Sequence, residues 1–92
     1  MIKSFGNKNT EILFKGRCPL KWQGIRVQAE RKLAMIDAAH TLEFLRSHPG
    51  NHLESLRGKR KNQYSIRINK QWRICFLWVD RAAHDVEIVD YH

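Results

Sequence analysis

The end of the chain and the basic stretch before it carry residue types that could do chemistry together. Asp90, Tyr91 and His92 are the last three residues of the sequence. Upstream, seven of the 17 residues from Arg57 to Arg73 are Lys or Arg, and none is an acid. The formal net charge is +8, so the other 75 residues together carry only +1. The positive charge is therefore local, and it precedes groups that can donate or accept protons.

The reaction that suits this set is RNA cleavage by attack of a ribose 2′-hydroxyl on the adjacent phosphate. Such a reaction needs a base for the hydroxyl proton, an acid for the leaving oxygen and cations around the phosphate. Arg73 is the leading candidate for the cationic role, because a guanidinium binds two phosphate oxygens at once and stays charged. His92 titrates near neutrality and could act as acid or base, with Asp90 to position it, while Tyr91 could stack on a base or donate a hydrogen bond. This scheme calls for no metal and no other cofactor.

Further polar residues are expected to join the same site. Glu54 precedes the basic stretch and is another candidate for proton transfer. The cations expected to contact phosphates of RNA or of a ribosome are Arg57, Lys59, Arg60, Lys61, Arg67 and Lys70. The alternative for such a basic run is a solvated surface, and a terminal Asp-Tyr-His could be an ordinary strand end.

A β-hairpin is expected to present these cations. Its two arms alternate apolar and polar positions, the apolar ones being Tyr64, Ile66 and Ile68, then Trp72, Ile74, Phe76 and Trp78. A three-residue loop at 69–71 keeps both apolar sets on one face, whereas a two-residue loop would put apolar residues opposite outward-facing ones. The longer loop pairs Ile66 with Ile74 and sets Arg67 opposite Arg73 on the other face. Paired like charges destabilise a sheet unless an anion lies between them, so this pairing indicates an anion site, the alternative being that both arginines splay into water.

The rest of the chain predicts helices and the remaining strands. Apolar residues spaced by three or four from Trp22 to Ala39 predict an amphipathic helix with its apolar stripe in the core. Thr41 is expected to cap a second, short helix that ends at residues 48–50. Ile2 and Phe5, together with residues 12–14, predict a short N-terminal strand.

Three later segments complete the expected sheet. Residues 53–56 are expected to form a turn or a short extended piece that delivers Glu54 and Arg57 to the sheet edge, 80–85 a turn, and 86–89 the last strand. The element order predicts an α+β fold, a small and mostly antiparallel β-sheet with two N-terminal helices packed on one face. The opposite face, with the arginines, is expected to be free.

Length and composition favour a single domain. With 92 residues of which 42% are apolar, residues 1–92 are expected to form one unit around one core. No apolar run approaches the roughly 20 residues of a membrane span, and the N-terminus lacks an apolar signal region, so we expect a cytoplasmic protein with no membrane attachment. Cys18 and Cys75 lack the spacing of metal ligands, and a Pro-Gly pair between His48 and His52 argues against a metal site there.

Five stretches carry a resemblance to a known family. They are MIKSF at the start, AERKLAMIDAA in the helix, PGNHLESLRG before the hairpin, YSIRINKQWRICF within it and VEIVDYH at the end. Over its whole length the sequence resembles the HigB-type toxins, including the GraT-like branch, of the RelE superfamily. The resemblance implies a metal-independent endoribonuclease that cleaves mRNA in the ribosomal A site. It also implies a cognate antitoxin, a small HigA-like helix-turn-helix protein. The toxin would contact operator DNA only through this antitoxin.

The resemblance also assigns roles to individual residues. Arg73 matches the catalytic arginine of the family, and Asp90, Tyr91 and His92 match its C-terminal acid, tyrosine and histidine. Glu54 departs from the pattern, because better-known members look to have a histidine there. A carboxylate at this position would repel phosphate unless it were paired with Arg57 or protonated, so the identity of the general base stays open.

Other classes of function stay open at this point. A non-catalytic RNA- or ribosome-binding module would use the same arginines to bind phosphate, and would protect RNA rather than cleave it. A DNA-binding protein is disfavoured, because the cations cluster on the expected hairpin and loop and not on a helix-turn-helix pattern.

Overall fold

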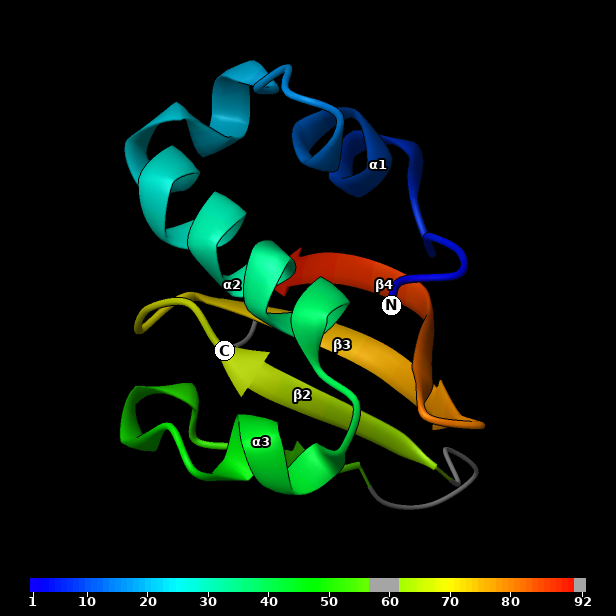
Figure 1. Ribbon diagram of the computed structural model, residues 1–92. Helices are drawn as coiled ribbons and strands as arrows, with labels where there is room; N and C mark the ends of the chain where they lie inside the picture. Colours follow the sequence, from blue (N-terminus) through cyan, green and yellow to red (C-terminus); the bar gives the residue numbers. More distant parts are fainter. Residues whose placement is uncertain (57–61, 91–92) are drawn as a thin grey trace.

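The structure is a computed structural model that describes residues 1–56 and 62–90. Its helical part comprises α1 (Lys8–Phe14), the 3₁₀ helix η1 (Leu20–Ile25), α2 (Arg26–Ala38), α3 (Leu42–Arg46) and the 3₁₀ helix η2 (Pro49–Asn51). The strands follow as β1 (Glu54–Ser55), β2 (Gln63–Arg67), β3 (Trp72–Val79) and β4 (Ala82–Asp90). They form one antiparallel sheet in the order β1-β2-β3-β4, with α2 lying across it (Figure 1). The predicted α+β class is confirmed.

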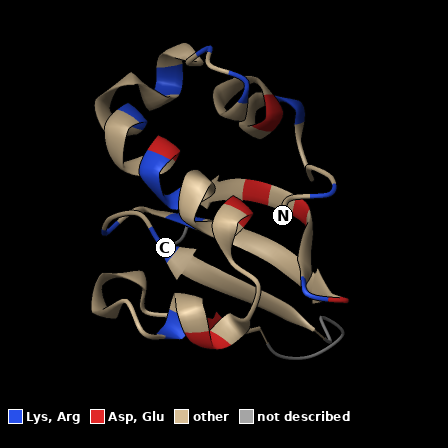
Figure 2. Cartoon of the chain, viewed as in Figure 1, with Lys and Arg blue, Asp and Glu red and all other residues tan. Residues whose placement is uncertain are grey.

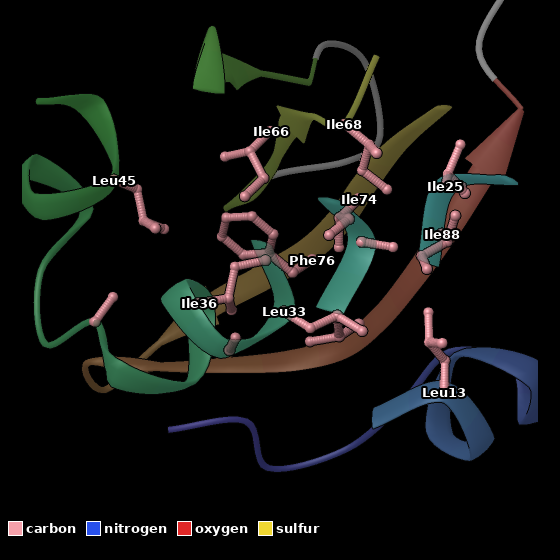
Figure 3. Packing of buried hydrophobic residues seen from close by; sticks show 14 of the residues in the cluster. Leu13, Ile25, Leu33, Ile36, Leu45, Ile66, Ile68, Ile74, Phe76 and Ile88 are labelled. Atoms are coloured by element: carbon pink, nitrogen blue, oxygen red, sulfur yellow. The ribbon is translucent and has the colours of Figure 1, made fainter. Parts of the chain in front are cut away.

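The core lies between α2 and one face of the sheet. All six members of the predicted apolar stripe are buried, namely Trp22, Ile25, Ala29, Leu33, Ile36 and Ala39. They pack against the alternating residues of the hairpin and of β4, as Figure 3 shows for Ile66, Ile74, Phe76 and Ile88. Burial of this apolar surface is the main force that holds the helix on the sheet. The hydrophobic periodicity therefore predicted the core correctly.

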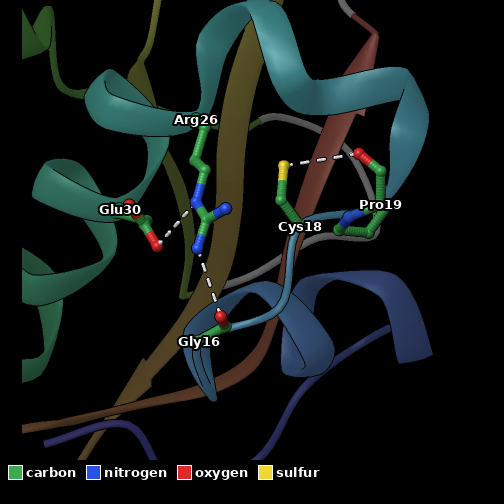
Figure 4. A network of polar contacts seen from close by, with 5 residues as sticks. All are labelled: Gly16, Cys18, Pro19, Arg26 and Glu30. Atoms are coloured by element: carbon green, nitrogen blue, oxygen red, sulfur yellow. Dashed lines mark hydrogen bonds and ion pairs between the residues drawn. The ribbon is translucent and has the colours of Figure 1, made fainter.

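The helix predicted from Trp22 is in fact built from two pieces. Residues 20–25 form the 3₁₀ helix η1, and α-helical geometry begins only at Arg26. Gly24 lies at this junction, and glycine is a poor α-helix former. Arg26 then ties the start of α2 to the end of α1, because its Nη2 donates to the carbonyl of Gly16 (3.2 Å) while its Nε donates to Glu30 (3.4 Å) (Figure 4).

The N-terminal segment is part strand and part helix. Ile2 and Phe5 form parallel bridges with Ala83 and Val86 of β4, so the predicted strand is right for these two residues. Gly6 belongs to the same contact, since a Cβ atom there would lie 2.9 Å from the carbonyl oxygen of Asp85.

The prediction is wrong for residues 12–14, which lie in α1. Asn7 caps this helix by accepting a hydrogen bond from the backbone N–H of Thr10 (2.9 Å). The buried Thr10 hydroxyl accepts from the N–H of Ile88 (2.9 Å), which docks α1 on β4.

The shorter predicted elements are mostly confirmed. Thr41 caps α3 by accepting from the N–H of Phe44 (3.1 Å), and Leu45 of that helix is fully buried. Residues 53–56 provide the short edge strand β1, which brings Glu54 to the sheet. Within the described residues, no helix is both long and apolar enough to cross a lipid bilayer.

The hairpin has the predicted register. Ile66 pairs with Ile74 and Arg67 with Arg73. At the loop, the side chain of Asn69 accepts hydrogen bonds from the backbone N–H groups of Gln71 (2.8 Å) and Trp72 (2.9 Å). A short polar side chain thus shapes the turn that the hydrophobic pattern had selected.

The turn predicted at residues 80–85 is much shorter than expected. Only Asp80 and Arg81 form it, both with positive φ (52° and 65°), and β4 already begins at Ala82. Asp85 has φ 51° where the pairing of β3 with β4 shifts register. His84 and Asp85, which the sequence assigns to the turn, therefore lie at an irregularity inside a strand, a common place for an extra residue in a sheet.

Candidate active site

The sheet face turned away from α2 carries the candidate site. Glu54 on β1 pairs with Ser65 on β2, and Arg67 on β2 pairs with Arg73 on β3. Directly paired residues project to the same side of a sheet, and so do residues two apart in one strand. Glu54, Ser65, Arg67 and Arg73 consequently share one face, as the sequence predicted for three of them.

Arg73 is the central side chain of this face. Only 6% of its surface is exposed. Its Nε donates to the hydroxyl of Ser65 (2.9 Å), and its Nη2 donates to the carbonyls of His52 (2.6 Å) and Ser65 (3.2 Å). An arginine stays charged even when buried, so these acceptors hold a permanent cation in a fixed orientation.

Glu54 lies beside the guanidinium without a close contact. Its Oε1 is 3.9 Å from Nη1 of Arg73, and 51% of its side chain is exposed. At this distance and exposure the carboxylate offsets the positive charge only in part. The ion pair of Glu54 within the described residues is thus with Arg73, whereas Arg57, the partner expected from the sequence, lies outside them.

Arg67 adds a second cation to the same face. It is half-buried and lies directly across from Arg73 in the β2–β3 ladder. Two like charges in this relation repel each other, and an anion between them removes the repulsion. The geometry therefore favours phosphate at the Arg67–Arg73 end of the face.

A hollow of about 380 Å³ continues this face away from the two arginines. Its walls include Gln63, Cys75 and Leu77, together with Asp85 and Glu87 of β4. Figure 2 shows acidic positions along β4, whereas β2 carries little charge in that view. The two ends of the face therefore differ in charge, and the arginine end is the one suited to an anion.

The loop before β1 supplies a hydrogen-bond acceptor to Arg73 at the edge of the sheet. His52, whose carbonyl accepts from Arg73, has a left-handed backbone (φ 44°). The preceding Asn51 is fully buried, and its Nδ2 donates to the carbonyl of Leu45 (2.9 Å). Lys32 of α2 donates to the Asn51 side-chain oxygen, and burial, with a smaller effect of the neighbouring Arg31, lowers the pKa of Lys32.

Asp90 lies elsewhere. It pairs with Trp72, whereas Arg73 pairs with Val89, so the alternation of side chains puts Asp90 on the helix-covered side of the sheet. Its Oδ2 accepts a hydrogen bond from Nε2 of Gln71 (3.1 Å). The register therefore places Asp90 and Arg73 on opposite faces of the sheet, contrary to the expectation that they converge on one face.

The other predicted site residues divide into two groups. Lys70 is exposed in the hairpin loop. Six lie outside the described residues: Arg57, Lys59, Arg60, Lys61, Tyr91 and His92. Sequence reasoning missed Ser65 and Asn51, although the β2 alternation that placed Arg67 on the outer face also places Ser65 there.

The family of the chain follows from comparison with known proteins. A sequence profile of the HigB-like toxins, described as "RelE-like toxin of type II toxin-antitoxin system HigB", matches residues 21–92. The chain belongs to this family. The resemblance found in the sequence is thereby confirmed, and the family match includes every candidate site residue.

Individual relatives of this HigB-like chain differ in how much they match. It is 51% identical over 53 residues to Toxin HigB-1 of Vibrio cholerae, a match that covers 58% of this chain and 56% of that protein. It is 43% identical over 56 residues to an uncharacterized protein of Haemophilus influenzae, covering 61% and 55% of the two. The chain thus matches about half the length of these two curated relatives. With Endoribonuclease HigB of Proteus vulgaris it is 30% identical over 96 residues, covering 100% of both.

The three-dimensional comparison agrees on the fold. A chain of the "YoeB-YefM complex from Staphylococcus aureus" superposes with a TM-score of 0.61 at 19% identity, covering 100% of this HigB-like chain and 98% of the other. At this identity the likeness shows the fold alone. The predicted RelE-like architecture is confirmed.

Proposed function

We propose that the chain is the toxin of a type II toxin–antitoxin system, a ribosome-dependent endoribonuclease that cleaves mRNA in the ribosomal A site in the cytoplasm. Membership of the HigB-like family supports the toxin role, and the relative named Endoribonuclease HigB supports the activity. The observation that carries the proposal is the buried, fixed guanidinium of Arg73, directly opposite Arg67 on the sheet face turned away from α2. This is a preorganised site for a phosphate whose negative charge grows during the reaction.

The proposed reaction is attack of a 2′-hydroxyl oxygen on the adjacent phosphorus. The P–O bond to the 5′ oxygen of the next nucleotide breaks, which leaves a cyclic phosphate and a free 5′-hydroxyl. Glu54, half-exposed and beside Arg73, accepts the proton of the 2′-hydroxyl in this proposal. Arg73 and Arg67 bind the phosphate oxygens, and His92 protonates the leaving oxygen, with Tyr91 assisting. No metal ion is assigned a role.

Ribosome dependence follows from how little of the substrate this site can hold. The two arginines of this face can fix a phosphate, but the 2′-hydroxyl must also lie in line with the leaving oxygen. A ribosome that holds the codon supplies that orientation, which is worth a large part of a reaction barrier. The basic stretch at 57–61 would contact ribosomal RNA phosphates. The proposed regulator is a HigA-like helix-turn-helix antitoxin, which alone would bind the operator.

The second candidate is an RNA- or ribosome-binding module without catalysis. The placement of Asp90 on the helix-covered side favours it, because that placement removes one proton-handling group from the phosphate site. In this case Arg67 and Arg73 would bind phosphate and Glu54 would only lower the affinity.

Mapping of mRNA 5′ ends distinguishes the two candidates. Purified protein is added to a translating extract, with Arg73→Ala protein and ribosome-free RNA as controls. New 5′ ends within ribosome-occupied codons, absent from both controls, are the expected result. Inhibited translation without new ends would instead establish the binding module.

A further inference from the structure

An arginine side chain rotates about several bonds, so its guanidinium has a defined orientation only when other groups hold it. We propose that Ser65 and Asn51 are positioning residues that hold the Arg73 guanidinium for the phosphate, Ser65 directly and Asn51 through the backbone of His52. This inference rests on the proposed function and adds two residues to its site. Neither touches the proposed substrate.

Ser65 holds Arg73 from the centre of the sheet. It is fully buried in β2. Its hydroxyl accepts from Nε (2.9 Å) and its carbonyl from Nη2 (3.2 Å), so one residue supplies acceptors to two of the three guanidinium nitrogens. Hydrogen bonds from a charged donor are stronger than neutral ones, and a buried donor that loses its acceptor is costly. A small hydroxyl at this position therefore fixes the inner edge of the guanidinium.

Asn51 acts on Arg73 from the opposite side, through the backbone of the adjacent His52. The His52 carbonyl accepts from Nη2 at 2.6 Å, and His52 has φ 44°, a backbone conformation that costs energy for a residue with a side chain. Such a conformation persists only where neighbours enforce it. Asn51 is the neighbour that does so, because its amide nitrogen is hydrogen-bonded to the carbonyl of Leu45 and its oxygen accepts from Lys32.

The two supports together define the plane of the guanidinium. With Nε bonded to Ser65 and Nη2 to His52, the third nitrogen, Nη1, lies on the side of Glu54, at 3.9 Å from its Oε1. The donor groups are then already oriented before RNA arrives, which is the condition under which electrostatic stabilisation is most effective. Loss of either support would remove an acceptor that orients the guanidinium.

The first test needs no ribosome and no RNA. The Nε–H signal of Arg73 is recorded by NMR on ¹⁵N-labelled protein and assigned by its absence in Arg73→Lys. Ser65→Ala is expected to speed exchange of this proton with water about tenfold or more, because its acceptor is gone. Ser47→Ala is the matched control, since it also removes a hydrogen-bonded serine hydroxyl, one that donates to the carbonyl of Phe44 at the exposed end of α3. It is expected to leave the Arg73 signal unchanged.

The second test asks whether this support acts on the reaction. Single-turnover cleavage on programmed ribosomes is measured for Ser65→Ala, and for Asn51→Asp, which keeps the shape but loses the donor to Leu45. Each is expected to lower the maximal rate about 10- to 100-fold, with little change in the protein concentration needed for half-maximal rate. In an Arg73→Ala background, Ser65→Ala is expected to change nothing further. Unfolding midpoints in urea are recorded for every variant.

Two results would overturn the inference. One is an Nε–H proton that stays equally protected in Ser65→Ala. The other is a loss of rate that is the same with and without Arg73, which would mark a general effect on the fold. If Ser65→Ala does not fold, Asn51→Asp decides by the same two readouts. Failure of the wild-type protein to cleave any RNA would refute the proposed function instead, and the exchange measurement would still decide whether Ser65 holds Arg73.

Discussion

Arg73 combines a permanent positive charge with almost complete burial, an arrangement that only arginine tolerates well. Burial shifts the pKa of a lysine downward, whereas a guanidinium stays protonated in proteins. The planar group also offers separate nitrogens to separate acceptors, as the contacts to Ser65 and His52 illustrate. Arginine is therefore the cationic side chain best suited to this buried position.

Replacement of Arg73 by lysine keeps a cation but loses the planar array of donors. We expect Arg73→Lys to lower the maximal cleavage rate about 100- to 1,000-fold, the effect of removing one fixed donor from a developing oxyanion. The measurement is single-turnover cleavage on programmed ribosomes. Arg46→Lys, on the exposed surface of α3, is the matched control. A rate within a few-fold of wild type would remove Arg73 from the catalytic site.

The role proposed for Glu54 predicts different effects of its replacement on the cleavage rate and on the affinity for RNA. Glu54→Gln keeps the size of the side chain and removes its charge. We therefore expect the cleavage rate to fall by up to about 100-fold, with RNA binding unchanged or tighter. Glu43→Gln, an exposed glutamate of α3, serves as control. An unchanged rate with tighter binding would mean that Glu54 only repels phosphate.

The residues of the site were predictable to different degrees. Arg67 and Arg73 followed from strict apolar alternation, since a one-residue shift would have exposed the core face. Asn51 could not be found this way, because its role depends on contacts with α2 and α3, which the sequence places 19 and six residues away. Asp90 was grouped with Arg73 by its place in a motif, although alternation along β4 assigns it to the other face.

At the scale of elements, α1 was missed because its helix signal is a cap and not a periodicity. Asn7 satisfies the first-turn N–H of Thr10, so we expect Asn7→Ala to lower the free energy of unfolding by about 1 kcal/mol. Urea denaturation followed by circular dichroism measures this. Asn9→Ala, inside the same helix, should have little effect or be slightly stabilising. Equal losses in both variants would argue against a specific cap.

The α2 stripe was predictable because its residues face the core at every turn. We expect Leu33→Ala, at a fully buried position, to cost about 2–5 kcal/mol of unfolding free energy. Leu20→Ala makes the same chemical change on η1, where Leu20 is 81% exposed, and should change stability by less than about 0.5 kcal/mol. Similar values for the two would contradict the packing of α2 on the sheet. The midpoint and slope of urea unfolding give both numbers.

At the scale of the whole molecule, the uneven charge distribution predicts a strong salt dependence of RNA binding. The stretch 57–61 holds three cations in succession, Lys59, Arg60 and Lys61. Their joint replacement by glutamine is expected to reduce the slope of log affinity against log salt by about 2, at roughly 0.7 per phosphate contact on a single strand. The control removes the same charge from the helices through Lys8→Gln, Lys15→Gln and Arg31→Gln. Equal slopes for the two triple variants would refute a localised contact surface.

The parallel pairing of residues 1–6 with β4 has a mechanical consequence. Four hydrogen bonds join them, between Lys3 and Ala83, Ala83 and Met1, Val86 and Ser4, and Gly6 and Val86. Because the two segments run in the same direction, a force that pulls residue 1 away from residue 90 slides one strand along the other and loads all these bonds at once. The molecule would therefore yield to such a pull only when the whole set ruptures together, whereas an antiparallel pair pulled from adjacent ends would open like a zip.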